Sequence, residues 1–427
     1  MLSQERNDQL TQVGPGTPMG DLLRRYWYPV ALVSDLEAFP VKRVRLLGED
    51  LALWKQPEGG YGIMQEKCPH RHASMVYGVV EPDGLRCGYH GWKFDPDGAC
   101  LDQPAEPADS AFKDKITAFA GQAEALGGLI FAYIGPRPAP ELPRYEAFVM
   151  DGVRDIGHAE LPCSWLQIME NAVDPHHVEW LHGQYFKFVG EQSGFVAPVS
   201  FQKRHMRTAF DPFEHGIVKR RLLDGQSEDS DDWKIGHPLV FPYQMWVGGN
   251  GIYQMQIRVP VDDVTTHKYF YTIHAPEGVT EFPERDPVAY EFPWRNDDGT
   301  HIVDYVEGQD IMAWVTQGAI TDRTAEHLGT SDTGVLMLRR MFRENMAAVE
   351  EGRDPLGVVR EEHDVIELPL EKDKFGAGFR FATDWIDMGS SRYSPQKDWL
   401  RQFHIDAAIE RGEVTPEEVA EVQEVQS

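Results

Sequence analysis

The sequence contains no run of about 18 apolar residues, the length that a helix needs to cross a membrane. Its longest apolar stretch is ALGGLIFAYIG at 125–135, which fits a buried strand. The first ten residues, MLSQERNDQL, lack the basic and apolar regions of a secretion signal. We therefore expect a cytoplasmic protein that does not bind membranes.

Basic residues and cysteines are also few. The 41 Lys and Arg against 69 Asp and Glu give a net charge of −28, which repels a phosphate backbone and argues against nucleic acid as a partner. Four cysteines in 427 residues are too few for a disulfide framework, so we expect a reducing compartment. No Gly-rich fingerprint follows a strand-like segment, which argues against NADH binding by this chain.

What the chain does contain predicts two domains. Its length exceeds that of one ordinary core. The stretch GPRPAPELPRY at 135–145 holds four prolines and is typical of a linker. We expect an N-terminal segment over 1–27, an all-β domain over 28–140, and a second domain over 141–427.

The second domain combines both kinds of secondary structure, so the predicted fold class is α+β. Strand-like segments occur at 255–261 and 268–276. Apolar spacing predicts a helix over 333–352, with Ser331 or Asp332 as its cap. An acidic helix over 415–427 is expected to be a solvated tail.

Two short motifs in the first domain carry metal-ligand chemistry. CPHRH supplies Cys68 and His70, and CGYH supplies Cys87 and His90. Zinc fingers usually pair Cys with Cys and His with His, whereas each loop here carries one of each. This arrangement lets both thiolates reach one iron and both imidazoles reach the other, as in a Rieske [2Fe–2S] cluster. A zinc ribbon, which would make a colourless interaction protein, is the alternative.

The segments CPHRH and CGYHGWKFD resemble the cluster motif of the Rieske aromatic-ring oxygenases. LLRRYWYPVAL at 22–32 and DRTAEHLGTSD further resemble large oxygenase subunits of the phthalate dioxygenase-like branch. The resemblance implies an all-β Rieske domain that delivers electrons, followed by a helix-grip-like domain with an antiparallel sheet and helices. It also implies that this second domain holds a mononuclear non-haem Fe(II).

The stretch NAVDPHHVEWLHG at 171–183 resembles the iron-binding motif of that family. The resemblance assigns His177 and His182 as iron ligands, Asp174 as an acid beside them, and Asn171 as a weaker candidate. His177 and His182 are five residues apart, a step of about 140° on an ideal α-helix. The helix must therefore bend or end between them; we expect Pro175 to disturb it and Gly183 to close it, with Asp174 and His177 on one face.

The third ligand of a 2-His-1-carboxylate site must come from farther along the chain. The segment from 307 to 332 resembles the part of the phthalate dioxygenase-like branch that supplies it, which makes Asp310 the first choice. Asp304, Glu307 and Asp322 are close enough to compete.

The resemblance also implies partners. O₂ is one substrate, and a separate reductase or ferredoxin supplies the electrons. Relatives form head-to-tail rings, usually trimers, in which Asp174 would bridge from His90 of the partner subunit to His177 or His182.

The organic substrate implied by the resemblance is an aromatic carboxylate, which needs an Arg or Lys in an apolar pocket. Arg258 is our candidate from the set Arg204, Arg207, Arg220, Arg221 and Arg258. The aromatic content at 241–255 favours O-demethylation or hydroxylation of a methoxylated, lignin-derived and possibly biaryl acid. The alternatives are cis-dihydroxylation of phthalate or a similar acid, and a Rieske electron carrier without oxygenase activity.

Overall fold

The computed structural model describes residues 1–372 and 378–419, and its N-terminal domain is built from three small antiparallel sheets. Tight hairpins connect neighbouring strands within two of these sheets. Leu47 and Gly48, both with positive φ, join β2 to β3, and Gly127 and Gly128 join β9 to β10 in the same way. The sheets are β1 (Tyr28–Leu32), β10 (Leu129–Tyr133) and β9 (Gln122–Leu126); β2 (Val41–Leu46), β3 (Glu49–Lys55) and β4 (Tyr61–Gln65); and β5 (Val79–Glu81), β6 (Gly84–Arg86), β7 (Lys93–Phe94) and β8 (Cys100–Asp102).

The C-terminal domain is organised around one eight-stranded sheet in the order β12-β13-β14-β15-β16-β17-β11-β18. Every neighbouring pair is antiparallel except β11 and β18, which run parallel. The strands are β11 (Val153–Leu161), β12 (His205–Phe213), β13 (Gly216–Leu223), β14 (His237–Val240), β15 (Gln244–Gly249), β16 (Ile252–Pro260), β17 (Thr266–His274) and β18 (Val288–Glu291).

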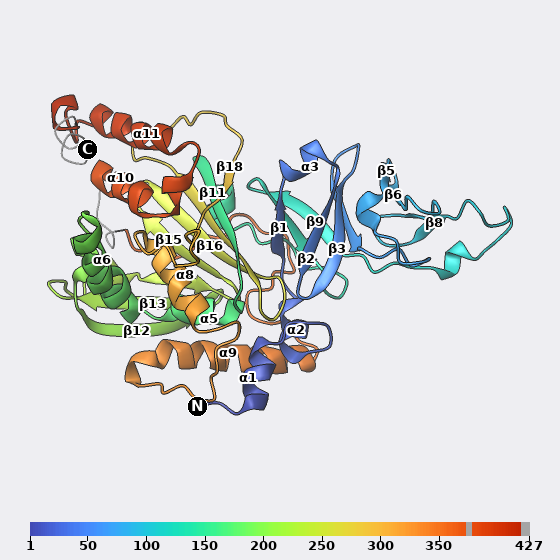
Figure 1. Ribbon diagram of the computed structural model, residues 1–427, viewed down its shortest axis with the longest axis horizontal. Helices are drawn as coiled ribbons and strands as arrows, with labels where there is room; N and C mark the ends of the chain where they lie inside the picture. Colours follow the sequence, from blue (N-terminus) through green and yellow to red (C-terminus); the bar gives the residue numbers. More distant parts are fainter. Residues whose placement is uncertain (373–377, 420–427) are drawn as a thin grey trace.

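Helices cover this sheet and close its lower end (Figure 1). In the view shown, α10 and α11 lie above the sheet, and α9 runs below it beside α1. The long helices are α1 (Gln4–Thr11), α2 (Pro18–Leu23), α5 (Trp165–Val173), α6 (Phe186–Ser193), α8 (Val306–Thr316), α9 (Thr333–Glu350), α10 (Gly378–Met388) and α11 (Lys397–Glu410). Among the described residues, no helix combines the length and apolar character that a membrane span requires.

The two domains share one hydrophobic core. Buried side chains from β1, β3 and β10 belong to the same cluster as those of β16, β17 and α5. The tip of the β2–β3 hairpin also joins the large sheet, because the N–H groups of Leu47 and Gly48 donate to the carbonyl oxygens of Pro260 and Val261 at 3.0 and 2.8 Å. The loops of the two Cys-His motifs have a separate small core, which includes Trp54, Met75 and Phe94.

The predicted α+β class is confirmed, with β-structure in the first domain and a mixed second domain. The helix expected over 333–352 is α9, which begins at Thr333 directly after Asp332. The Asp332 carboxylate accepts the N–H of Gly329 rather than one from the helix. Most of the acidic tail expected over 415–427 lies outside the described residues, which end at 419. The domain boundaries at 27 and 140 stay predictions.

A buried ion network joins the N-terminal segment to the C-terminal domain. Glu170 of α5 accepts from Arg323 at 2.7 Å and from Arg339 of α9 at 2.6 Å. Arg323 also donates to the side chain of Asn7 in α1 at 3.2 Å. Desolvation opposes ionisation of Glu170, but the two guanidinium groups lower its pKa below the usual value. Glu170 therefore pairs with two buried cations, and Arg339 also pairs with Glu326.

We expect Glu170→Ala to lower the free energy of unfolding by about 3–5 kcal/mol, because it leaves two desolvated guanidinium groups without their shared partner. Urea denaturation followed by circular dichroism measures this loss. Arg340→Ala is the matched control, since Arg340 forms an exposed pair with Glu344 on the same helix as Arg339 and should change stability by less than about 1 kcal/mol. Equal effects of the two substitutions would contradict the role given to Glu170.

Candidate metal centres and their cavity

The two Cys-His motifs lie on neighbouring loops of the N-terminal domain. Cys68 and His70 follow β4, and Cys87 and His90 lie between β6 and β7. The N–H of Cys68 donates to Ala73 at 2.8 Å, and the N–H of Cys87 donates to Trp92 at 2.8 Å, so each loop is closed by its own backbone. Gly91 adopts φ +74°, which this tight turn requires.

The donors of the two loops converge in pairs. Both cysteine side chains are buried, and burial raises the pKa of Cys68 to about 11, with Cys87 adding to the effect. The imidazole rings of His70 and His90 pack edge to face, with centroids 4.6 Å apart, and His70 stacks on Trp92. The Nδ1 atom of His70 is buried and has no hydrogen-bond partner in the described part of the chain. A bound metal would give Nδ1 of His70 a partner and would stabilise the cysteines as thiolates in spite of their burial.

The second predicted motif folds into a π-helix. Helix α5 ends at Val173, a turn through Pro175 follows, and the π-helix spans Val178–Tyr185 before α6 begins. Because a π-helix repeats its hydrogen bonds from i to i+5, residues five apart return to nearly the same face. The imidazoles of His177 and His182 accordingly lie 5.2 Å apart by ring centroid. The expected interruption is present, but the prediction that Gly183 ends the helix is wrong; the helical run ends at Gly194, with φ +84°.

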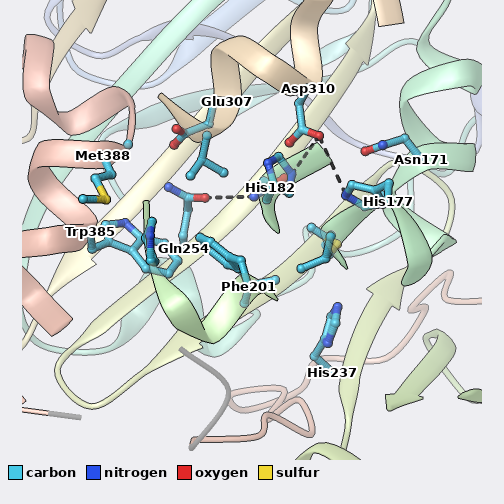
Figure 2. A pocket seen from close by; sticks show the side chains of 18 of the residues that line it. Asn171, His177, His182, Phe201, His237, Gln254, Glu307, Asp310, Trp385 and Met388 are labelled. Atoms are coloured by element: carbon cyan, nitrogen blue, oxygen red, sulfur yellow. Dashed lines mark hydrogen bonds and ion pairs between the residues drawn. The ribbon is translucent and has the colours of Figure 1, made fainter. Parts of the chain in front are cut away.

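Asp310 of α8 completes the group. Its Oδ1 atom lies 3.2 Å from Nε2 of His182 and 3.8 Å from Nε2 of His177 (Figure 2). Among the described residues, these three side chains form the group of His, Cys, Asp or Glu whose donor atoms all lie within 4.8 Å of one another. Within residues 1–372 and 378–419, the buried Oδ1 atom has no hydrogen-bond partner. Two imidazole nitrogens and one carboxylate oxygen that face one point fit a mononuclear iron. The four donors of the Cys-His loops do not all face one point, which is compatible with a cluster of two irons.

The carboxylates that competed with Asp310 have other partners. Asp304 pairs with Arg392 at 2.9 Å, and Glu307 accepts the N–H and hydroxyl of Ser390 at 2.9 and 3.0 Å. Asp322 accepts from Thr324 on the surface. Of these four acids, Asp310 is therefore the one that meets both imidazoles.

Neighbouring groups fix the orientation of the histidines. Nδ1 of His182 lies 3.0 Å from Oε1 of Gln309, whose amide group in turn donates to Val303 at 3.0 Å. The amide of Gln309 is thereby oriented with its oxygen toward His182, so Nδ1 carries the proton and Nε2 is left to face Asp310. Gln309 was not among the predicted site residues, although its position next to Asp310 was a signal.

Asp174 is placed differently from the prediction. It does not share a helix face with His177; instead it precedes the helical turn, where its carboxylate accepts the N–H groups of His176 at 2.8 Å and His177 at 3.3 Å. These two bonds satisfy backbone donors where helical structure begins again at His176 and His177, as the side chain of an N-cap residue does. Burial raises the pKa of Asp174, but the contacts with His177 and His176 and the charge of Lys219 lower it to about 2. The carboxylate therefore stays ionised 3.8 Å from Nδ1 of His177, with its side chain 29 % exposed.

A cavity of about 160 Å³ opens beside His177, His182 and Asp310. One face of the large sheet forms its floor, and helices α8 and α10 form the opposite wall, with Trp385 and Met388 on α10 (Figure 2). Asn171 lies in the wall next to His177. The floor residues are Lys219, His237, Met245, Val247, Gln254, Gln256 and Arg258.

Arg258 faces this cavity and is 1 % exposed. Its Nη1 atom donates to the backbone oxygen of Gln256 at 2.7 Å, and Nη2 donates to Oε1 of the same residue at 2.9 Å. Burial lowers the pKa of Arg258 to about 9, opposed by the charge of Asp310, so the guanidinium stays cationic at neutral pH. Three of the other candidate arginines are paired elsewhere: Arg207 with Glu228, Arg220 with Asp211, and Arg221 with Asp232. Gln254 and Gln256 were missed, although alternation from Arg258 along a strand places them on its face.

Models of known families match consecutive parts of the chain. A Rieske [2Fe–2S] domain matches residues 26–120, a vanillate O-demethylase oxygenase C-terminal domain matches 161–289, and a LigXa C-terminal-like domain matches 297–398. A Rieske domain followed by an oxygenase domain defines a class of terminal oxygenases. The chain belongs to the Rieske non-haem iron oxygenases, as a large (alpha) subunit that uses a Rieske cluster and a mononuclear iron.

Among its relatives is the 5,5′-dehydrodivanillate O-demethylase oxygenase subunit of Sphingobium sp. (strain NBRC 103272 / SYK-6), with 42 % identity over 84 % of each chain. The phthalate 4,5-dioxygenase oxygenase subunit of Pseudomonas putida is 33 % identical over 84 % of this chain and 89 % of that one. The solved structure of the NdmA QL mutant with caffeine, from Pseudomonas putida CBB5, superposes with a TM-score of 0.57 at 22 % identity, covering 82 % of this chain and 100 % of that one, a likeness of fold alone.

We expect Gln309→Leu to weaken iron binding at the His177, His182 and Asp310 group about 10- to 100-fold, because His182 loses the acceptor that sets its tautomer. Iron retained against a graded series of chelator concentrations measures the affinity, with the visible absorbance of the cluster as internal reference. Gln317→Leu, an exposed position at the end of the same helix, is the control. Unchanged iron retention in Gln309→Leu would rule out this orienting role.

Proposed function

We propose that this oxygenase oxidises an aromatic carboxylate, by O-demethylation or hydroxylation of a methoxylated and possibly biaryl acid. The observation that carries the proposal is Arg258, a buried guanidinium in a largely apolar cavity beside the candidate iron ligands. Among the described residues, no carboxylate lies within ion-pair distance of Arg258. A desolvated cation of this kind favours a ligand that brings the anion.

The guanidinium is held ready for such a ligand. Gln256 occupies one hydrogen of each terminal nitrogen of Arg258, while Nε is buried without a hydrogen-bond partner among the residues that the structure describes. Lys268 also donates to Oε1 of Gln256, at 3.3 Å, so this oxygen accepts from both side chains. The unused N–H groups of a guanidinium match the two oxygens of a carboxylate. We propose Arg258 as the carboxylate anchor that places the ring and its substituent beside Asp310.

We assign the metal ligands from the positions of the two Cys-His loops and of the group His177, His182 and Asp310. Cys68, His70, Cys87 and His90 would hold the Rieske cluster, and His177, His182 and Asp310 would hold the iron. The iron supplies O₂ activation with electrons delivered through the cluster. The chain's own contribution is to fix the Nε2 atoms and the carboxylate toward one point, to anchor the acid, and to exclude water with the aromatic walls of the cavity. Demethylation of a methoxy carbon would release formaldehyde. We favour demethylation over dihydroxylation because a relative with 42 % identity is a 5,5′-dehydrodivanillate O-demethylase oxygenase subunit.

We further propose a head-to-tail homotrimer or a multiple of it. Large apolar side chains are exposed beside the cluster motif, at Tyr77 and Tyr89, and around the stretch that carries Asp174, at Trp180 and Phe188. Exposed apolar surfaces of this kind favour burial against another chain, and two different surfaces on one subunit favour a ring. Asp174 would then accept a hydrogen bond from His90 of the partner subunit and link it to His177. A separate reductase or ferredoxin in the cytoplasm would supply the electrons, and Asn171 would line the same path.

The direct test measures formaldehyde released from methoxylated aromatic acids by the enzyme with its iron, a reductase, NADH and O₂. Diol formation from phthalate is scored in parallel. We expect formaldehyde from the wild type, and we expect Arg258→Met to raise KM for the acid tenfold or more, since the anion loses its bidentate partner. KM for the methyl ester of the same acid should change little, which makes the ester the matched control. Diol without formaldehyde would favour ring dihydroxylation, and neither product from any such acid would refute the proposal.

Asp174→Asn should keep three irons per chain and the cluster spectrum but reduce turnover more than a hundredfold, because a neutral amide cannot hold the ionised bridge between two imidazoles. Iron and sulfide analysis beside single-turnover kinetics checks both halves of this expectation. His176→Asn, at the adjacent histidine outside the ligand group, serves as the control. Wild-type turnover in Asp174→Asn would remove Asp174 from the electron path.

A further inference from the structure

We infer that His237, held by Glu371, forms a second polar subsite in the cavity and binds a second acidic oxygen group of the substrate, which makes the enzyme selective for a two-ended aromatic acid. This inference rests on the proposed function, because it takes Arg258 as the anchor for the first acid group.

The dyad is fully buried. Nδ1 of His237 lies 2.9 Å from Oε1 of Glu371, and the two side chains are 2 % and 1 % exposed. The backbone N–H of Glu371 donates to Gly236 at 2.9 Å, which fixes the carboxylate next to the first residue of β14. Nδ1 of His237 therefore faces the Glu371 carboxylate. Nε2 is on the opposite edge of an imidazole, so this edge is directed away from the carboxylate.

The ring of His237 is also part of the cavity wall. Figure 2 shows it well apart from Asp310 and His177, on the far side of the cavity. A buried imidazole backed by a carboxylate is suited to donate a hydrogen bond to an anionic or strongly accepting oxygen, because the carboxylate stabilises the positive charge on the ring. Carboxylates and acidic phenols are the ligand groups with this property.

Strand register gives the spacing of the two anchors. Met245 pairs with Leu239 of β14 and with Gln256 of β16, so these two residues are level with each other. His237 is then level with Gln254, and Arg258 lies four residues further along β16. With neighbouring strands about 4.8 Å apart and about 3.3 Å per residue, the backbone positions of His237 and Arg258 differ by about 10 Å across the sheet and about 13 Å along it.

The surface between the anchors suits an extended aromatic molecule. Met245 and Val247 give it apolar floor contacts, and Phe201 and Trp385 line the cavity above. A short acid that binds Arg258 by its carboxylate would leave the His237 end unfilled. A molecule with acidic groups at both ends would contact both anchors and bury its rings between them.

The experiment compares a two-ring diacid, 5,5′-dehydrodivanillate, with its one-ring counterpart vanillate. Dissociation constants are measured by calorimetry on the iron-loaded enzyme without reductant, and KM and kcat by formaldehyde release. We expect His237→Asn and Glu371→Gln each to weaken binding of the diacid about tenfold or more, the effect of losing a hydrogen bond to a charged group. Binding of vanillate should change less than about threefold.

Several outcomes separate the possibilities. His215→Asn is the control histidine, since it lies in the turn before β13 and outside the cavity lining. Equal weakening of both acids, or no weakening of either, would overturn the subsite while leaving formaldehyde release by the wild type as support for the proposed function. Neither binding nor turnover of either acid by the wild type would refute both. If His237→Asn lost iron or secondary structure, Glu371→Gln would decide, because it keeps the size of the side chain.

Discussion

The site depends on one geometric constraint, the five-residue interval between His177 and His182. An α-helix would turn these imidazoles away from each other, so they can face one point only if the backbone changes its hydrogen-bond repeat. The π-helix at Val178–Tyr185 provides that change. The surrounding structure supports it: Asp174 caps the turn before it, and Gly183 lets the segment around Phe201 approach closely, since a Cβ there would lie 2.5 Å from the Phe201 oxygen.

The same region concentrates charge where solvent is excluded, and each charge is compensated differently. Glu307 is satisfied by Ser390, while burial raises its pKa. Lys268 lies over the rings of Phe270 and Trp314, and desolvation lowers its pKa well below the usual value. Gln256 serves both Lys268 and Arg258 through one oxygen. A neutral amide thus holds Arg258 in place beside Lys268 without cancelling the positive potential of the guanidinium that an anionic substrate would meet.

The sequence predicted these features to different degrees, for physical reasons. Cys68, His70, Cys87 and His90 are close in sequence, so their spacing alone indicated a two-iron cluster. Asp310 lies on a helix far from the histidines in sequence, and only the family resemblance separated it from Asp304 and Glu307, six and three residues away. The π-helix could not be predicted in kind, because no residue preference specifies it; spacing indicated only that an α-helix would fail. Gly183 was misassigned as a terminator because a close contact with a distant segment, invisible in sequence, accounts for this glycine.

His237 and Gln309 illustrate a further limit. Their significance comes from partners 134 and 127 residues away in the chain, Glu371 and His182, and no local pattern records such pairs. Arg258 was accessible in part, since alternation along a strand gives two faces. Alternation does not indicate which of the two faces lines the cavity.

The shared core has a consequence for modularity. Apolar side chains of β1, β3 and β10 pack with those of the large sheet, and the tip of the β2–β3 hairpin continues into it through Pro260 and Val261. The N-terminal domain, which carries the cluster motifs, is therefore not expected to fold as an independent unit. Cutting the chain between residues 134 and 153 would expose half of a core on each fragment, and exchanging the N-terminal domain with that of a distant relative would require complementary changes in β16 and α5. Substitutions on one side of the shared core would therefore favour compensating substitutions on the other side.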